Sequence, residues 1–508
     1  MPLISVITPL FNPEMKTLKQ CLESAVAPDV EHILVLDGVS NIRNVRALRR
    51  MANRHGARLE IIPKHVGISA ASNRGVEIAS GEILVFLDQD DLLEEKWFRP
   101  MIVAFENADF VYSDAYMGDE RGRAVSTLRK PDWSPIRLIF NMYAVHFMAI
   151  RKTTFKQAGG FRSEFDGAQD HDLALRVSRI SAKARHIRSP LYTWRKGSKS
   201  TAGNASNKTW AYEAGVRAAQ DHLNVLAPGS EAKTVSGYPG ALKVNFPPRE
   251  LPVSIVIPTG FKTNLCSEFY YEMLLKSLLP YIDAEIGDEV IIVHGGEVSS
   301  ESIENVSLAL PVRVSSVIDS SQFNFSRRVN IGFSRAVNEH VLLLNDDMYF
   351  GTENPLDQLF GFLGLPNVGL VGGLLVFPDF SIQHGGHVFV DGIPTHLGYG
   401  ESSLEVGLYD LVVDREASGV TGALMFQLKS TWQAVGGFST TLPLAFNDVD
   451  YCLKVRSVGY SIVQANSVTA FHYESSTRNP GTEQWELDFL QYRWRDALSD
   501  DGYSAPYT

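Results

Sequence analysis

Residues 83–95 read ILVFLDQDDLLEE, an apolar run that passes directly into three carboxylates, Asp88, Asp90 and Asp91. A short apolar run of this kind predicts a strand that is covered on both faces of a sheet. Carboxylates crowded at the end of a strand repel one another and cost stability unless a positive charge lies among them. In open α/β sheets, ligands bind off the carboxyl ends of the strands. We therefore predict a cation site here, with Asp91 capping a helix over the following LLEEKW segment.

The sequence contains the same pattern twice. SVITPLFN near the start resembles SIVIPTGF at 254–261. NRGVEIASGEILVFLDQDD at 73–91 aligns with NIGFSRAVNEHVLLLNDDM at 330–348. AGGFRSEFDGAQDHDLALRV at 158–177 aligns with VGGFSTTLPLAFNDVDYCLKV at 435–455, with one extra residue in the second copy. Three matched segments in the same order indicate a tandem of one architecture.

Each copy alternates predicted strands with helical segments, which is typical of a mostly parallel sheet covered by helices. The predicted strands are 3–8, 32–37, 58–62 and 83–88 in the first copy and 253–258, 289–293, 312–317 and 340–345 in the second, with helical spacing at 15–26 and 69–79. A chain of 508 residues exceeds what one core usually holds. We predict a first domain at 1–205, a connecting helix and Pro/Gly-rich linker at 206–250, a second domain at 251–498 and a polar tail at 499–508.

The composition is that of a soluble globular protein and argues against several other classes. Hydrophobic residues make up 44% and charged residues 21%, which is ordinary for a soluble globular chain, and the net charge of −11 argues against nucleic acid as a partner. Three cysteines are too few for a disulfide framework and fit a reducing compartment. The start, MPLISVITPLFNP, lacks the features of a signal peptide, and no run reaches 18 apolar residues. We expect a cytoplasmic protein without a transmembrane segment, which could still contact the inner face of a membrane peripherally.

A second acidic cluster occurs in each copy. Asp170 and Asp172 lie in GAQDHDLALRV, and Asp448 and Asp450 lie in FNDVDYCLKVRSVGY. Two carboxylates two residues apart do not share a helix face, so one can face a cleft while the other caps the helix or forms an ion pair. A carboxylate beside a neutral hydroxyl can act as general base. The alternative is an ordinary acidic helix N-terminus, which we expect for one member of each pair.

These motifs resemble family 2 glycosyltransferases of the GT-A fold, and in particular bacterial tandem enzymes similar to rhamnosyltransferases and other surface-polysaccharide transferases. The strings that carry the resemblance include DFVYSDAYMGDERGR, SPLYTWRKGSKSTAG, FNFSRRVNIG, GLVGGLLVFPDFSIQHGG and FHYESSTR. The resemblance covers nearly the whole chain. It implies an α/β fold of two tandem Rossmann-like domains for nucleotide-diphospho-sugars, each with a mostly parallel central sheet.

The resemblance also assigns roles position by position. The implied catalytic bases are Asp170 and Asp448. The implied donor-binding residues are Asp37, which faces the nucleotide base, Asp88, Asp90, Asp91, Arg195, Ser200, Asn345, Asp346 and Asp347. The implied ligands of a divalent cation, Mn²⁺ or Mg²⁺, are Asp90, Asp347 and His472. The role of His384 does not follow from the residues.

The function that this resemblance implies is transfer of a sugar from a UDP- or dTDP-linked donor to a hydroxyl of a glycan, lipid-linked or protein acceptor, with inversion. This chain departs from the pattern of the family at two places. His294 stands where the family has an acidic residue after the second strand, and the segment after Trp194 shows no metal-binding histidine. One or both domains could instead be a catalytically degenerate carbohydrate-binding module. A dinucleotide-dependent oxidoreductase is disfavoured because no G-x-G-x-x-G follows the first strand of either copy. A sugar-phosphate nucleotidyltransferase would need a Gly-rich basic loop at the same place.

Overall fold

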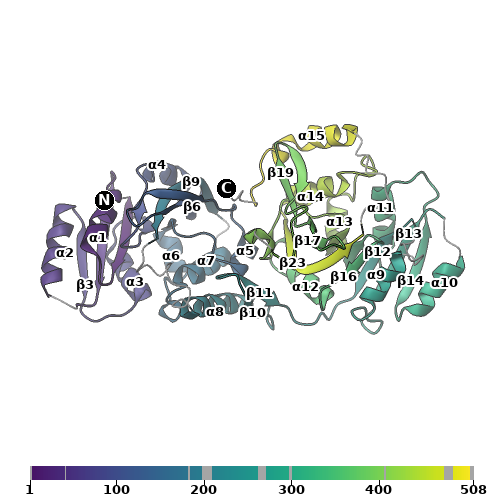
Figure 1. Ribbon diagram of the computed structural model, residues 1–508, viewed down its shortest axis with the longest axis horizontal. Coiled ribbons are helices and arrows are strands. Elements are labelled where there is room, and N and C mark those ends of the chain that lie inside the picture. Colours follow the sequence, from purple (N-terminus) through teal and green to yellow (C-terminus); the bar gives the residue numbers. More distant parts are fainter. Residues whose placement is uncertain are drawn as a thin grey trace. The chain divides into compact units, whose positions relative to one another are not determined.

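The computed structural model describes residues 3–39, 42–180, 183–196, 209–260, 270–296, 300–405, 408–473 and 484–503. The chain divides into two compact units (Figure 1). Unit 1 holds the residues up to Val225 together with Ala232–Leu242, and unit 2 holds Leu226–Glu231 and the residues from Lys243 onward.

Unit 1 is an α/β unit around one large sheet. Its strands are β1 Ile4–Leu10, β2 Val30–Asp37, β3 Arg58–Ile62, β4 Ile83–Phe86, β5 Leu92–Leu93, β6 Phe110–Gly118, β7 Ala124–Leu128, β8 Met148–Arg151 and β9 Ala184–Arg195. Its helices are α1 Met15–Ser24, α2 Ile42–Arg54, α3 Ile68–Ile78, α4 Phe98–Phe105, α5 Pro135–Phe140, α6 Lys152–Gln157, η1 Ser163–Phe165, α7 Gln169–Ile180 and α8 Thr209–Leu226. The sheet order is β3-β2-β1-β4-β8-β6-β9-β5, with β7 beside β6. The pairs among β1 to β4 are parallel, and β8 runs antiparallel between β4 and β6.

Unit 2 repeats this topology. Its strands are β12 Val253–Pro258, β13 Glu289–His294, β14 Arg313–Ile318, β15 His340–Leu344, β16 Met348–Phe350, β17 Val368–Val376, β18 Ile382–His384, β19 His387–Val390, β20 Ile393–His396, β21 Arg415–Glu416, β22 Leu424–Leu428 and β23 Ser461–His472. Its helices are α9 Tyr270–Leu278, α10 Ser300–Ala309, α11 Phe325–Arg335, α12 Pro355–Leu363, η3 Tyr409–Leu411, α13 Lys429–Ala434, α14 Asn447–Ser457 and α15 Gln484–Leu498. The sheet order β14-β13-β12-β15-β22-β17-β23-β16 matches that of unit 1 strand for strand. The predicted α/β fold class with two tandem domains is confirmed by the two matching sheets.

One contact shows how the repeated sequence produces the repeated fold. Asn73 on α3 accepts the backbone N–H of Phe161 and donates to its carbonyl at 3.0 and 2.8 Å. Asn330 on α11 makes the same two bonds to Phe438, at 2.9 and 2.8 Å. In both units an asparagine of the helix before the acidic strand thus fixes the Gly-Gly-Phe turn that leads to the second acidic helix. The two acidic segments of each unit are tied together by this bond pair.

The segment predicted as a linker is partly ordered. Glu231–Thr234 forms β10 and Leu242–Asn245 forms β11, and the two strands pair in a small sheet of their own. Ala232, Leu242 and Val244 are buried while the other residues of these two strands are exposed, which is the alternation of a half-buried strand. Prolines and glycines around these strands hid this alternation from the composition-based prediction.

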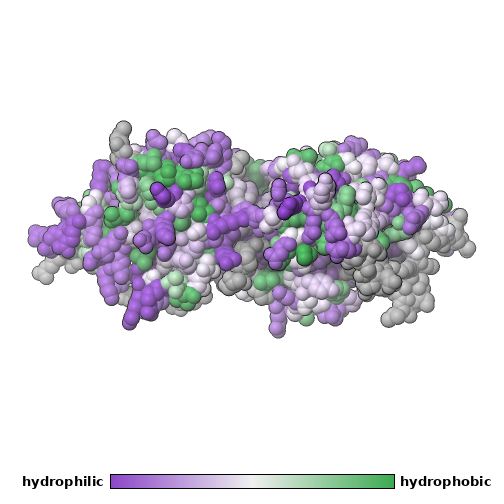
Figure 2. All heavy atoms as spheres, turned by 90° about the horizontal axis from the view of Figure 1, so that it is seen from above, coloured by the Kyte–Doolittle hydropathy of each residue, from purple (hydrophilic) through white to green (hydrophobic). Residues whose placement is uncertain are grey.

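The face of the molecule that Figure 2 shows is mainly polar. Figure 2 shows hydrophilic side chains over most of one face, with hydrophobic groups in smaller clusters between them. No helix in the described ranges is both long and apolar enough to cross a bilayer.

Candidate active sites

The three carboxylates of the first unit follow β4, as predicted, but Asp91 does not cap a helix. Leu92–Leu93 pairs with β9 as strand β5, and the next helix begins only at Phe98. Asp91 instead accepts the Tyr192 hydroxyl at 2.7 Å and the backbone N–H of Arg195 at 2.8 Å. The prediction of a cap is therefore wrong, because a strand pairing across the sheet overrides the local signal. Asp91 fixes β9 to the acidic cluster.

Asp88 and Asp170 line one pocket. Its walls come from the ends of β1 and β4, the start of α3 and the start of α7, and they include Asp88, Val145, His146, Asp170 and Tyr192. Burial, with the nearby Asp90 and Asp170 carboxylates, raises the pKa of Asp88 to about 7. Burial likewise raises the pKa of Asp170 above its usual range. Fold and sequence repeat therefore bring the strand-end carboxylate and the predicted base into one cavity.

His146 is a site residue that sequence analysis did not identify. One ring nitrogen of His146 lies with carboxylate oxygens of Asp88 and Asp91 in a group whose members are all within 4.8 Å. Its ring packs on Trp194 with a centroid distance of 4.4 Å. Oxygen and imidazole ligands together suit a divalent transition ion such as Mn²⁺. The residue follows α5, far from both acidic motifs, so no spacing signal links it to them.

Arg195 brings a buried positive charge to the same edge. Its side chain is 3% exposed, and Nη1 donates to Gln20 at 3.0 Å, but Nε and Nη2 have no hydrogen-bond partner among the described residues. Burial raises the pKa of Asp90, and the nearby guanidinium of Arg195 opposes that rise. An anionic ligand would satisfy these donors. Ser200, predicted for the same role, lies outside the described residues.

The carboxylate of Asp37 is occupied by contacts within the first unit. Its carboxylate accepts the backbone N–H groups of Val66 at 2.7 Å and Gly67 at 3.0 Å, and the ring of His65 lies 2.7 Å away. In unit 2, His294 occupies the matching strand end and bonds Ser316 at 2.8 Å instead. The two units therefore differ in charge at the strand end where the family resemblance implies nucleotide-base recognition.

In the second unit, the predicted metal ligands lie together. His472 Nε2 is 3.0 Å from Asp347 Oδ1 and 3.3 Å from the Asn345 amide, and its Nδ1 contacts Gln383 at 2.6 Å. The antiparallel pairing of β16 with β23 places Met348 opposite His472, and this register brings the acidic loop to the histidine. Asp346 points elsewhere and accepts the Thr259 hydroxyl at 2.5 Å. Asp347 and His472 fit a divalent cation.

Asp448 differs electrostatically from its counterpart Asp170. Its oxygens accept the backbone N–H groups of Val449 at 2.8 Å and Gly422 at 3.0 Å, and His387 Nε2 lies 3.6 Å away. Burial alone would raise its pKa, but His387 and the Gly422 N–H hold the pKa of Asp448 well below the usual range. Asp170 is thus the more basic of the two carboxylates.

The second member of each acidic pair is structural, as expected. Asp172 is 1% exposed and forms ion pairs with Arg162 and, at 2.5 Å, with Arg176. Asp450 is fully buried and accepts the Trp494 indole N–H at 2.8 Å, with Arg493 at 3.1 Å. Both pairs lie in the first turn of a helix, α7 or α14. Of these four carboxylates, Asp170 and Asp448 are therefore the candidates for the catalytic base.

The raised pKa of Asp88 predicts a cation-dependent stability profile. A carboxyl group whose folded pKa exceeds its unfolded value binds more protons when folded, so stability falls as pH rises from about 4 through 7. In chelator at pH 8, Asp88→Asn should therefore melt at least about 2–4 °C above wild type, the shift that 1 kcal/mol produces in a domain of this size. The gain should shrink towards pH 5, and Mn²⁺ should stabilise wild type more than the variant. Equal melting of both proteins at all pH values would contradict this.

Comparison with known proteins gives a consistent family. The Glycosyl transferase family 2 sequence model matches residues 5–163. The O-antigen biosynthesis protein RfbC of Myxococcus xanthus is 30% identical over 525 aligned residues, which cover all of this chain and 40% of that protein. The uncharacterized protein y4gI of Sinorhizobium fredii is 30% identical, with coverage of 97% and 56%. The chain thus spans less than two thirds of the length of these relatives.

Similar solved structures include S. aureus TarS 1–349 in complex with UDP-GlcNAc, with a TM-score of 0.36 at 16% identity, covering 44% of this chain and 66% of that chain. GalNAc-T7 with UDP, GalNAc and Mn²⁺ has a TM-score of 0.40 at 11% identity and covers 51% of this chain and 50% of that chain.

Proposed function

We propose that this chain, whose first domain belongs to glycosyl transferase family 2, transfers a sugar from a UDP- or dTDP-linked donor to an acceptor hydroxyl, with inversion and with a divalent cation. The observation that carries the proposal is the pocket shared by Asp88 and Asp170. A transferase of this kind needs a carboxylate beside the leaving diphosphate and a second one beside the acceptor. The acceptor that we favour is a surface glycan, because a relative spanning the whole chain is named for O-antigen biosynthesis.

In the proposed reaction, Asp170 removes the proton of the acceptor hydroxyl as that oxygen attacks the anomeric carbon, and the nucleoside diphosphate departs on the opposite side. Arg195 donates from Nε and Nη2 to the departing phosphates. A bound Mn²⁺ or Mg²⁺ would neutralise the diphosphate. Asp88, Asp91 and His146, which lie together, would hold the ion in the first domain with the predicted ligand Asp90. Asp347 and His472 would hold it in the second domain.

The second domain supports a rival role. Asp448 is less basic than Asp170, and a neutral acceptor needs a base. The second domain could therefore hold the acceptor glycan while the first domain transfers the sugar. The contact between Asp347 and His472 favours a second donor site instead, so the two roles must be separated by experiment.

The test is nucleoside diphosphate release from a panel of nucleotide sugars with Mn²⁺, for wild type, Asp90→Ala and Asp347→Ala. Each substitution should lower turnover of one donor about 10²–10³-fold, the usual loss when one electrostatic contact to a developing charge is removed. Asp496→Ala, which changes an exposed carboxylate on α15, is the control and should keep full turnover.

The pattern of loss discriminates the alternatives. Loss in both variants, towards different donors, identifies two transferases in one chain. Loss only in Asp90→Ala identifies the second domain as an acceptor-holding module. Inversion is tested separately by the anomeric configuration of the product in NMR. A wild-type protein that binds glycans but turns over no donor would overturn the proposal in favour of a carbohydrate-binding protein.

A further inference from the structure

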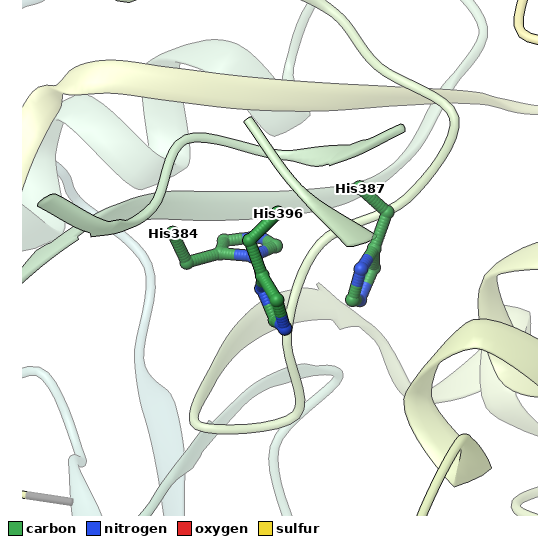
Figure 3. Close-up of side chains that lie close together, drawn as sticks. All are labelled: His384, His387 and His396. Atoms are coloured by element: carbon green, nitrogen blue, oxygen red, sulfur yellow. The ribbon is translucent and has the colours of Figure 1, made fainter. Parts of the chain in front are cut away.

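Three histidines of the second unit converge outside the donor site. His384 ends β18, His387 begins β19 and His396 ends β20, so two short strand pairs bring them together. Figure 3 shows their imidazole rings gathered around one space. One nitrogen from each ring lies within 4.8 Å of the others, and the ring centroids are 4.8 to 5.1 Å apart. Three imidazoles at this spacing are the ligand set of a transition-metal site.

His387 is the ring that most needs a ligand. Its side chain is 3% exposed, and neither Nδ1 nor Nε2 has a hydrogen-bond partner among the described residues. A buried ring with two unsatisfied nitrogens is rare in folded proteins because each lost bond to water must be compensated. A cation in the shared space would satisfy His387.

The hydrogen bonds of the His384 and His396 rings determine which contacts would change when a metal ion binds. The backbone N–H of Thr421 donates to His384 Nε2 at 3.1 Å, so a neutral His384 carries its proton on Nδ1. That proton lies between His384 Nδ1 and His396 Nδ1, which are 2.6 Å apart. A metal ion would replace this proton, and the rings would separate slightly while His384 gave up its bond to Thr421. One lost hydrogen bond is small against the free energy of binding a zinc ion.

The surrounding charges also permit a cation. Asp448 Oδ2 lies 3.6 Å from His387 Nε2 and supplies a nearby negative charge. Arg415 lies close by and acts against a cation, but its Nη2 is committed to the Gly385 carbonyl at 2.8 Å. Imidazole nitrogens with one carboxylate select Zn²⁺, Cu²⁺, Ni²⁺ or Co²⁺ over Mg²⁺ and Ca²⁺. We propose that His384, His387 and His396 form a Zn²⁺-type site beside Asp448, distinct from the donor cation site of Asp347 and His472.

Metal binding here does not depend on the proposed function. If that function holds, a metal beside Asp448 would lie where the acceptor hydroxyl is bound, and its charge would favour deprotonation of that hydroxyl. This second statement rests on the proposed glycosyl transfer, whereas the metal content of the protein can be measured without any substrate.

The experiment is metal analysis of the full chain. Wild type is stripped with chelator, reloaded with Zn²⁺ and desalted, and bound metal is measured by mass spectrometry; a Co²⁺-loaded sample is examined for visible d–d absorption. Wild type should retain about one equivalent of Zn²⁺ and show the bands of low-symmetry Co²⁺. His387→Gln and His384→Gln should bind Zn²⁺ about 100-fold or more weakly.

Two control variants locate the site. His340→Gln changes a histidine of β15 outside the cluster and should keep the metal. Asp347→Ala disables the donor cation site and should also keep it. Loss of Zn²⁺ in Asp347→Ala but not in His387→Gln would assign the metal to the donor site and overturn the inference, as would a wild type that retains no Zn²⁺ and shows no Co²⁺ bands. The wild-type spectrum needs no variant to fold.

Discussion

Asp170→Asn is expected to lower kcat for sugar transfer by the first domain about 10²–10⁴-fold, the usual contribution of a general base. The substitution keeps the shape of the side chain and its place in the first turn of α7. It removes the only property that the reaction needs, the ability to accept a proton. Because Asp170 lies on α7 and the strand-end carboxylates that would bind the donor follow β4, the binding of the nucleotide sugar should change little.

Asp448→Asn is the matched comparison in the repeat. The low pKa of Asp448 makes it a weak base, so its removal should cost less than removal of Asp170. The measurement is kcat and KM for each variant on the donors identified above, with donor binding followed separately by calorimetry. The wild-type rate of the first domain should also fall on acidification at a pH above the usual carboxyl range, since burial raises the pKa of Asp170.

A contrary result would be informative. If Asp170→Asn keeps its turnover while KM for the acceptor rises, Asp170 binds the acceptor hydroxyl and does not deprotonate it. If Asp448→Asn is the variant that loses all turnover, the second domain is the transferase, and the base there works at its low pKa with help from the neighbouring histidines.

The sequence predicted the parts of the site that depend on local pattern. Runs such as Ile83–Phe86 became strands, and the acidic pairs at Asp170 and Asp448 lie in the first turns of helices because both features follow from spacing and charge along a single segment. The internal repeat extended this to topology, since two copies of one pattern must share one sheet order.

What sequence could not predict depends on contacts between distant segments. The bonds of Asp91 to Tyr192 and Arg195 arise from strand pairing across the sheet, so a local cap signal was misleading. His146 lies in the segment between α5 and β8, and it joins the carboxylates of the cluster through the fold, with no motif to mark it. His387 becomes a candidate metal ligand only because two short strand pairs bring three histidine rings together. In each case the fold determines which distant residues come into contact, and the spacing of residues along the chain does not reveal these contacts.

Asp172→Ala should lower the free energy of unfolding of the first domain by about 3–5 kcal/mol, the usual cost when one partner of a buried ion pair is removed. Asp172 is 1% exposed and forms ion pairs with both Arg162 and Arg176. Arg176 is itself buried, and its Nη2 also donates to the Gly160 carbonyl at 2.7 Å, so it cannot turn to water when its carboxylate is lost. An unpaired guanidinium would remain beside the Gly-Gly-Phe turn.

Asp221→Ala is the control, because Asp221 contacts the same Arg162 Nη2 at 2.8 Å but its side chain is 42% exposed. An exposed pair contributes about 0–1 kcal/mol, so this variant should unfold nearly like wild type. Denaturant unfolding measures the free energy of unfolding of both variants. Turnover per folded molecule distinguishes the structural role of Asp172 from the catalytic role proposed for Asp170. Asp172→Ala should retain turnover at low temperature, where it is folded, whereas Asp170→Asn should be stable and inactive. Equal unfolding of Asp172→Ala and Asp221→Ala would show that the buried pair adds no stability, and the acidic doublet would then need another explanation.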